Sequence, residues 1–64
     1  MSNLNLQKAK SIANQYFTLL IEKHRALGYK VEVVEQTQNS DTSYYIKFTN
    51  SQNLSKLYEI QNIN

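Results

Sequence analysis

The strongest constraint on the fold is a run of helical periodicity from Asn5 to Leu27, closed by Gly28, the only glycine in the chain. With successive residues placed about 100° apart, apolar side chains gather on one side of this run and polar side chains on the other. The apolar side comprises Leu6, Ala9, Ile12, Ala13, Tyr16, Phe17, Leu19, Leu20, Ile21 and Leu27. This pattern is typical of an amphipathic helix that lies on a core, so we predict one helix over about residues 5–27.

The apolar arc of this helix is wider than a single packing contact requires. It spans roughly 200°, whereas one contact needs a stripe of roughly 100°. The middle of the arc, which we expect to face the chain's own sheet, comprises Ala9, Tyr16, Leu20 and Leu27. The flank at Phe17 and Ile21 needs a second cover, which either a C-terminal helix or another chain would provide.

The ends of the helix carry local signals. Gly28 suits the position just after the helix, where the backbone turns left-handed and glycine does so without steric cost. Tyr29 would then pack back on the last turn, in which His24 and Arg25 complement the helix dipole. Either Asn3 or Asn5 would cap the start.

After Gly28 the period changes from that of a helix to that of a strand. Residues 29–36 and 43–49 each alternate apolar and polar side chains, which predicts two strands joined as an antiparallel hairpin. The face expected to pack on the helix comprises Val31, Val33, Ile46 and Phe48. The segment between the strands lacks an Asn-Gly or Asp-Gly pair, so we expect a turn longer than two residues.

The C-terminal segment carries a weaker helical pattern. Thr49, Asn50 and Ser51 are residue types that cap helices, and Leu54, Leu57 and Tyr58 follow with helical spacing. We therefore predict a short helix over about residues 51–61. The expected fold is a single α+β domain over residues 1–64 with the order α-β-β-α, and residues 1–4 are expected to be frayed.

Size and composition limit the functions that the chain can perform. A chain of 64 residues buries only about 60% of the surface that its unfolded form exposes. Without cysteine, and with one histidine, it has no means of forming disulfides or a typical zinc site, so we expect no metal and no cofactor. The sequence contains no run long enough to span a membrane and no signal-peptide core, and we expect a cytoplasmic protein.

Residues with catalytic chemistry are few and badly placed. His24 is the one histidine and fits a structural role at the helix end. Glu32 and Glu35 are three apart on a predicted strand and would face opposite sides of the sheet. A single glycine excludes a glycine-rich phosphate loop. We therefore predict no catalytic residues and no enzymatic activity.

The first functional hypothesis is a small protein-binding or regulatory module. It would act as an inhibitor or adaptor of a larger protein, like the accessory proteins of phages and mobile elements. The expected partner interface comprises Phe17, Ile21, Val34 and Tyr45. Open strand edges also favour self-association, for example a homodimer that joins two hairpins.

The alternative hypothesis is a weak nucleic-acid-binding domain. The predicted element order resembles that of the double-stranded RNA-binding domain, and residues 29–35 are similar to its first strand. That family places lysines at the start of its last helix, whereas this chain has Asn50, Ser51, Gln52 and Asn53 there. Nucleic-acid contacts would therefore come from the predicted first helix and the residues just after it, at Lys8, Lys23, Arg25 and Lys30.

Overall fold

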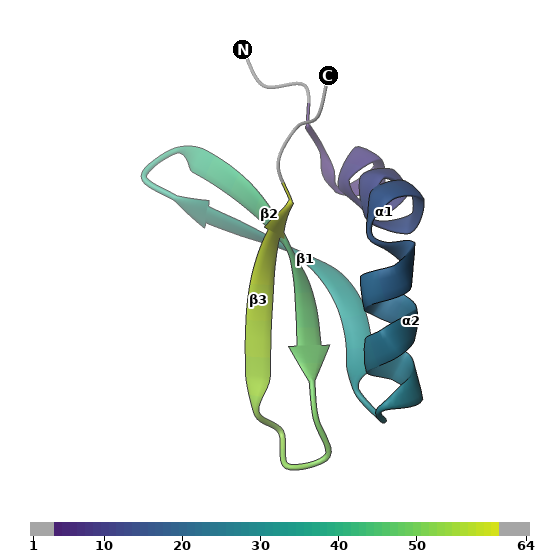
Figure 1. Cartoon of the computed structure of the whole chain (residues 1–64). Helices are drawn as coiled ribbons and strands as arrows, with labels where there is room; N and C mark the ends of the chain where they lie inside the picture. The colour runs from purple at the N-terminus through teal and green to yellow at the C-terminus, as the bar shows by residue number, and fades with distance from the viewer. Residues whose placement is uncertain (1–3, 61–64) are drawn as a thin grey trace.

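Two helices precede a three-stranded antiparallel sheet in the structure, a computed structural model that describes residues 4–60 (Figure 1). The elements are α1 (Leu6–Tyr16), α2 (Thr18–Ala26), β1 (Lys30–Gln38), β2 (Asp41–Thr49) and β3 (Ser55–Ile60). The chain is thus a small α+β domain, but the predicted order α-β-β-α is wrong. Fraying is predicted for residues 1–4, of which residues 1–3 lie outside the described residues and Leu4 packs against the core.

The sheet has the order β1-β2-β3, and the two helices cover one of its faces (Figure 1). Within residues 4–60, neither helix is long and apolar enough to cross a membrane. The core forms between the covered face and the helices, and its buried hydrophobic residues are Ala9, Ile12, Ala13, Ile21, Tyr44, Ile46, Phe48 and Ile60. The strand residues of this core face the helices, as do Val31 and Val33, which pair with Phe48 and Ile46.

The predicted single helix is interrupted at Phe17, whose φ of −118° and ψ of 22° are not helical. The backbone N–H of Phe17 still donates to the Ala13 carbonyl, and its own carbonyl accepts from Ile21. The Thr18 hydroxyl donates to the carbonyl of Asn14, which a continuous helix would offer to the Thr18 backbone N–H. The side chain of Thr18 thus supplies a local alternative to the helical hydrogen bond.

The interruption changes which side of the chain faces the sheet. On one continuous helical wheel, the buried residues of α1 and those of α2 would be centred roughly 100° apart. These residues are Ala9, Ile12 and Ala13 in α1 and Ile21 and His24 in α2. The rotation leaves Leu27 exposed, and Tyr16, the last residue of α1, is exposed as well, so the expectation that these two residues face the sheet is wrong.

The signals at the helix ends are confirmed. The Asn5 side chain caps α1 and accepts a 2.8 Å hydrogen bond from the backbone N–H of Lys8. Gly28 has a φ of +93°, and the N–H groups of Gly28 and Tyr29 donate to the carbonyls of Arg25 and His24. This pair of bonds is a Schellman motif, in which a left-handed glycine ends the helix.

The turn between β1 and β2 is shorter than predicted. Gln38 pairs with Asp41, so Asn39 and Ser40 alone form the turn, with φ values of 52° and 69°. Two successive positive φ angles are the mark of a type I′ turn, whose backbone twist matches that of the flanking strands. The prediction failed because it required glycine, whereas Asn39 tolerates the left-handed region and Ser40 is held in it.

The predicted C-terminal helix over residues 51–61 is wrong, because residues 55–60 form β3. The side-chain oxygen of Asn50 accepts hydrogen bonds from the N–H groups of Gln52 and Leu54, at 2.9 and 3.0 Å. Asn53 has a φ of 63°, and the chain turns back to pair with the free edge of β2. The same small polar side chains can cap a helix or close a turn, and here they close a turn.

We predict that Ser40→Gly stabilises the fold by about 1 kcal/mol, because glycine adopts a positive φ without the clash that a Cβ atom creates. Urea denaturation followed by circular dichroism would measure the change. Gly28→Ala is the reverse control and should destabilise by about 1 kcal/mol through its backbone alone, since no atom lies within 4 Å of an added Cβ. A neutral or destabilising Ser40→Gly would contradict the two-residue turn.

Candidate functional site

The most exposed apolar side chains on the helical side of the molecule lie on α2 and next to it. Leu19 is 82% exposed and Leu27 is 67% exposed, while Tyr16 and Tyr58 are each about half exposed. Leu20 is partly buried against the core. We name the set Tyr16, Leu19, Leu20, Leu27 and Tyr58 the α2 patch.

The α2 patch follows from the interruption at Phe17 and from the place of β3. Because α2 is rotated relative to α1, Leu19 and Leu27 are directed away from the sheet. Tyr58 points to the helical side, since it pairs with the buried Ile46, yet the helices pack chiefly on β1 rather than on β3. The rings of Tyr58 and of Phe17, which lies between the two helices, are 6.3 Å apart, so Tyr58 lies beside the start of α2.

The charged residues that border the α2 patch are Lys23 and Lys56, with Glu22 at its outer margin beside Leu19. Lys23 is exposed and lies on α2 between Leu20 and Leu27, on the same side of the helix. Lys56 lies on the same face of β3 as Tyr58, and its Nζ is 5.3 Å from the centroid of the Tyr29 ring. The patch thus has a positive charge at its centre and another where α2 ends.

Of the carboxylates among the described residues, Glu22 alone borders the α2 patch, and it does so on the side of Leu19. Glu22 is on the opposite side of α2 from Leu20 and Leu27 by the helical angle, and Glu59 is on the uncovered face of β3. Asp41 is at the hairpin turn, and Glu32 is on the uncovered face of β1. Glu35 accepts a hydrogen bond from the Tyr44 hydroxyl at the other end of the sheet.

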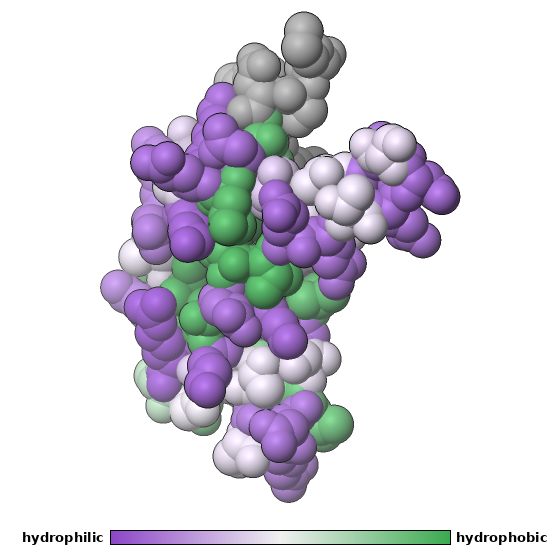
Figure 2. All heavy atoms as spheres, turned by 180° about the vertical axis from the view of Figure 1, so that it is seen from behind, coloured by the Kyte–Doolittle hydropathy of each residue, from purple (hydrophilic) through white to green (hydrophobic). Residues whose placement is uncertain are grey.

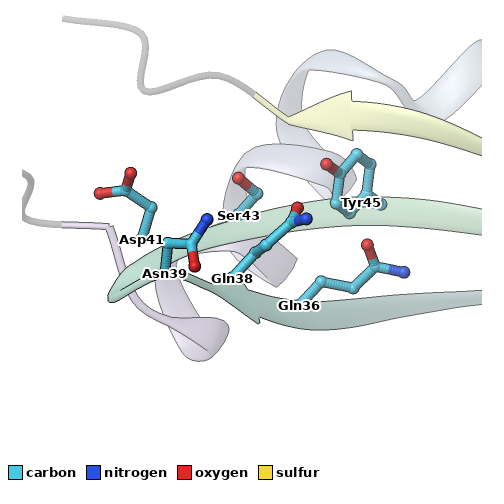
Figure 3. Close-up of a pocket in the computed structure, with 6 residues that line it drawn as sticks. All are labelled: Gln36, Gln38, Asn39, Asp41, Ser43 and Tyr45. Carbon is cyan, nitrogen blue, oxygen red and sulfur yellow. The ribbon is translucent and has the colours of Figure 1, made fainter.

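The uncovered face of the sheet is mainly polar. Val34 and Tyr45 are cross-strand partners there, both half-buried, and Leu57 lies on β3 on the same face. A pocket of about 200 Å³ lies at the hairpin. It is lined by Gln36, Gln38, Asn39, Asp41, Ser43 and Tyr45 (Figure 3). It is smaller than typical small-molecule sites of roughly 300–1,000 Å³, and one carboxylate among amides and hydroxyls offers no acid–base pair.

A groove lies where the helices meet the outer strand β1. Figure 2, which views the molecule from behind Figure 1, shows hydrophobic residues in a band between hydrophilic margins. The groove is lined by Lys10, Asn14, Ile21, Arg25, Val31, Glu32 and Val33. Its polar groups come from both walls, with Lys10 and Arg25 on the helices and Glu32 on the strand.

The four residues predicted as a partner interface lie on two different sides of the sheet. Phe17 and Ile21 are on the helical side, where Ile21 is a core residue at 5% exposure and Phe17 is half-buried. Val34 and Tyr45 are on the uncovered face. The structure therefore brings them together in two pairs and does not form one surface from all four.

The exposed residues of the α2 patch lie beside the predicted ones in sequence. The wide apolar arc was the signal for them, since it contains Tyr16, Leu19 and Leu27. Of the residues predicted to contact nucleic acid, Lys8, Lys23 and Arg25 are exposed on the two helices and Lys30 is exposed at the start of β1. They are spread over three elements rather than gathered on one.

His24 is part of the core. It is 8% exposed, and its Nδ1 lies 2.8 Å from the Leu20 carbonyl oxygen. Its ring stacks on Phe48 at 4.0 Å and meets the edge of Tyr29 at 5.0 Å. Among residues 4–60, no three histidine, aspartate or glutamate side chains are close enough to hold a metal ion.

Tyr44 and Glu35 interact across β1 and β2. The Tyr44 hydroxyl donates to Glu35 Oε2 at 3.2 Å from within the core. Burial, the hydrogen bond and the charge of Glu35 together raise the pKa of Tyr44 above its ordinary value. The folded chain therefore holds this proton more tightly than the unfolded chain does.

We predict that this effect appears as a loss of stability in alkali. Below pH 10 Tyr44 is neutral in both states, and above it the unfolded state loses the proton first. The free energy of unfolding should fall as the pH rises from about 10 through the folded pKa, and less steeply in Tyr44→Phe. Denaturation at a series of pH values measures both slopes, and parallel slopes would contradict the assignment. Tyr58→Phe is the control, because Tyr58 is about half exposed.

Comparison of the chain with protein-family models, with curated proteins and with solved structures finds no match.

Proposed function

We propose that the chain is a small, non-enzymatic protein-binding module that contacts its partner through the α2 patch. The observation that carries this proposal is the exposure of Leu19 and Leu27 on one helix, beside the half-exposed Tyr16 and Tyr58. Single exposed apolar residues are normal, whereas a group of them on neighbouring elements is typical of an interaction surface.

The shape of the patch favours a macromolecular partner over a small molecule. Its most exposed members project from the outside of a helix, whereas small-molecule sites are concave and enclose most of their ligand. Burial of one leucine side chain against a partner contributes about 1.5–3 kcal/mol. Leu19 and Leu27 together are therefore enough to act as anchors of a contact.

A regulatory role suits a module of this kind. Residues 4–60 provide one covered sheet face and the α2 patch, and such a chain acts by occupying a surface of a larger protein. We propose that it inhibits or adapts that protein rather than transforming a substrate.

We predict that Leu19→Glu abolishes capture of the partner while the fold is kept, because Leu19 is 82% exposed and contributes little to the core. The measurement is affinity capture from a lysate of the source organism, followed by quantitative mass spectrometry. The expected loss is about tenfold or more for the captured protein. Circular dichroism would confirm that the variant is folded.

Leu57→Glu is the matched control, since Leu57 is also an exposed leucine but lies on the uncovered face of the sheet. It should leave capture unchanged. If both variants capture the same proteins as the original chain in equal amounts, the α2 patch is not the binding surface.

Self-association is a separate proposal and is supported by a different feature. β1 is nine residues long and, within the described part of the chain, is hydrogen-bonded to a strand on one side only. An edge strand of this length offers unpaired backbone groups to a second copy. The predicted dimer of two hairpins would then become a dimer of two three-stranded sheets.

We predict that the molar mass measured by light scattering exceeds 7.5 kDa at high concentration and falls toward 7.5 kDa on dilution. Leu19→Glu should follow the same curve, because the α2 patch is not part of the β1 edge. A mass of 7.5 kDa at every concentration would contradict self-association and would leave the proposed partner binding untouched.

A further inference from the structure

We infer that the partner presents an amphipathic helix whose apolar stripe is flanked by carboxylates, and that this helix lies along the α2 patch. The inference rests on the proposed function, since it states which chemistry the same patch would recognise. The argument uses the direction of the patch, the charges on it and the positions of the chain's own carboxylates.

The patch runs along a helix axis, which favours a helical partner. Leu20 and Leu27 are seven residues apart on one side of α2, and they are therefore separated by about 10 Å along the helix. Leu19 widens this row on the outer side, and Tyr58 of β3 widens it on the other. Side chains spaced three, four and seven residues apart on a second helix would match such a row.

An extended peptide would not use this surface. Strand addition depends on free backbone N–H and C=O groups at a sheet edge, and the backbone of α2 is hydrogen-bonded within the helix. The α2 patch offers side chains alone. A helix is the element that buries a row of side chains while it satisfies its own backbone.

The charges on the patch select an acidic partner. Lys23 stands between Leu20 and Leu27 and is exposed, and Lys56 is held over the Tyr29 ring where α2 ends. Among the carboxylates of residues 4–60, Glu22 lies beside Leu19 at the outer margin of the patch, and the others lie on the uncovered sheet face, at the hairpin turn or in the bond with Tyr44. Glutamate or aspartate on the side of the partner's stripe that faces Lys23 and Lys56 would therefore meet two cations.

The same charges disfavour a second copy of this chain as the occupant. Two α2 patches packed face to face would bring Lys23 and Lys56 of each copy into one interface, with Glu22 only at its outer margin. Like charges at an interface suppress the wrong partner, which is the usual role of such residues.

Three synthetic helical peptides of about 15 residues test the inference. The first carries leucines in one stripe with glutamates on its flanks, the second has lysines in place of the glutamates, and the third has the acidic composition with its leucines dispersed around the helix. Fluorescence anisotropy at two salt concentrations measures binding of each to the full chain. The first peptide should bind about tenfold more tightly than the second, with the difference falling as salt rises.

Charge reversal provides the matched variant. The double variant Lys23→Glu and Lys56→Glu should invert the preference, so that the lysine peptide binds more tightly than the glutamate peptide. The double variant Lys8→Glu and Lys30→Glu changes the net charge equally at exposed sites outside the patch and should keep the original preference. Leu19→Glu should abolish binding of the first peptide, and Leu57→Glu should not.

The outcomes separate this inference from the proposed function. Equal binding of the acidic and basic peptides, or of the striped and dispersed peptides, would overturn the inference. So would binding of none of the peptides, even if Leu19→Glu still loses captured proteins and the proposed function stands. If the chain forms a dimer that Leu19→Glu dissociates, the occupant of the α2 patch is a second copy of the chain. If the chain sediments with phosphatidylserine vesicles and Leu19→Glu abolishes this sedimentation, the occupant is a membrane surface. Either result would overturn the inference.

Discussion

The hydrogen-bond pattern around Phe17 determines the arrangement of the rest of the molecule. Because the Thr18 hydroxyl bonds to the Asn14 carbonyl and Phe17 leaves the helical region, α2 starts with a new rotation about its axis. The rotation brings Ile21 and His24 onto the sheet, where His24 stacks on Phe48. A continuous helix would instead have directed the side of Leu20 and Leu27 to the core. One change of backbone angle thus decides both what is buried and what is left outside.

The third strand has a comparable effect on the other margin of the sheet. Residues 55–60 bond to the free edge of β2, so β2 is paired on both sides along the segment that carries Tyr44, Ile46 and Phe48. A helix in this position would have covered the helical side of the sheet and shielded Phe17. As a strand, the segment contributes Ile60 to the core and leaves Tyr58 half exposed. Compared with the predicted C-terminal helix, β3 adds hydrogen bonds to the sheet and adds no third helix to the helical layer.

The features that the sequence predicts well are those set by residues close together in the chain. Gly28, the cap at Asn5 and the inward face of β1 and β2 depend on local backbone preference or on strict alternation, and all agree with the structure. The helix interruption was not predictable in this way, because the residues around Phe17 keep helical periodicity on both sides. Residues 54–58 fit a helix or a strand equally in so short a window, and the choice depends on β2 offering a free edge.

The residues of the candidate site were predicted less well from the sequence, because their exposure depends on the helix interruption at Phe17. The width of the apolar arc indicated that part of the helix surface would exceed what the sheet could cover, and its members included the exposed Leu19 and Leu27. The part of the arc that is exposed depends on the rotation of α2 relative to α1, and the helical periodicity of the sequence does not predict this rotation. Ile21 was assigned to the flank and lies in the core, and Leu27 was assigned to the core and lies outside.

The exposed leucines of the α2 patch contribute little to the stability of the folded chain. Among the described residues eight hydrophobic side chains are buried, so the core is small, and each member is important for folding. Hydrophobic stabilisation is proportional to the area removed from water, and Leu19 and Leu27 remove little in the isolated chain. Their apolar character therefore contributes to a contact with another molecule far more than to the fold, whereas that of Ile21 contributes to the fold. Leu19 and Ile21, two residues apart in α2, therefore have different roles.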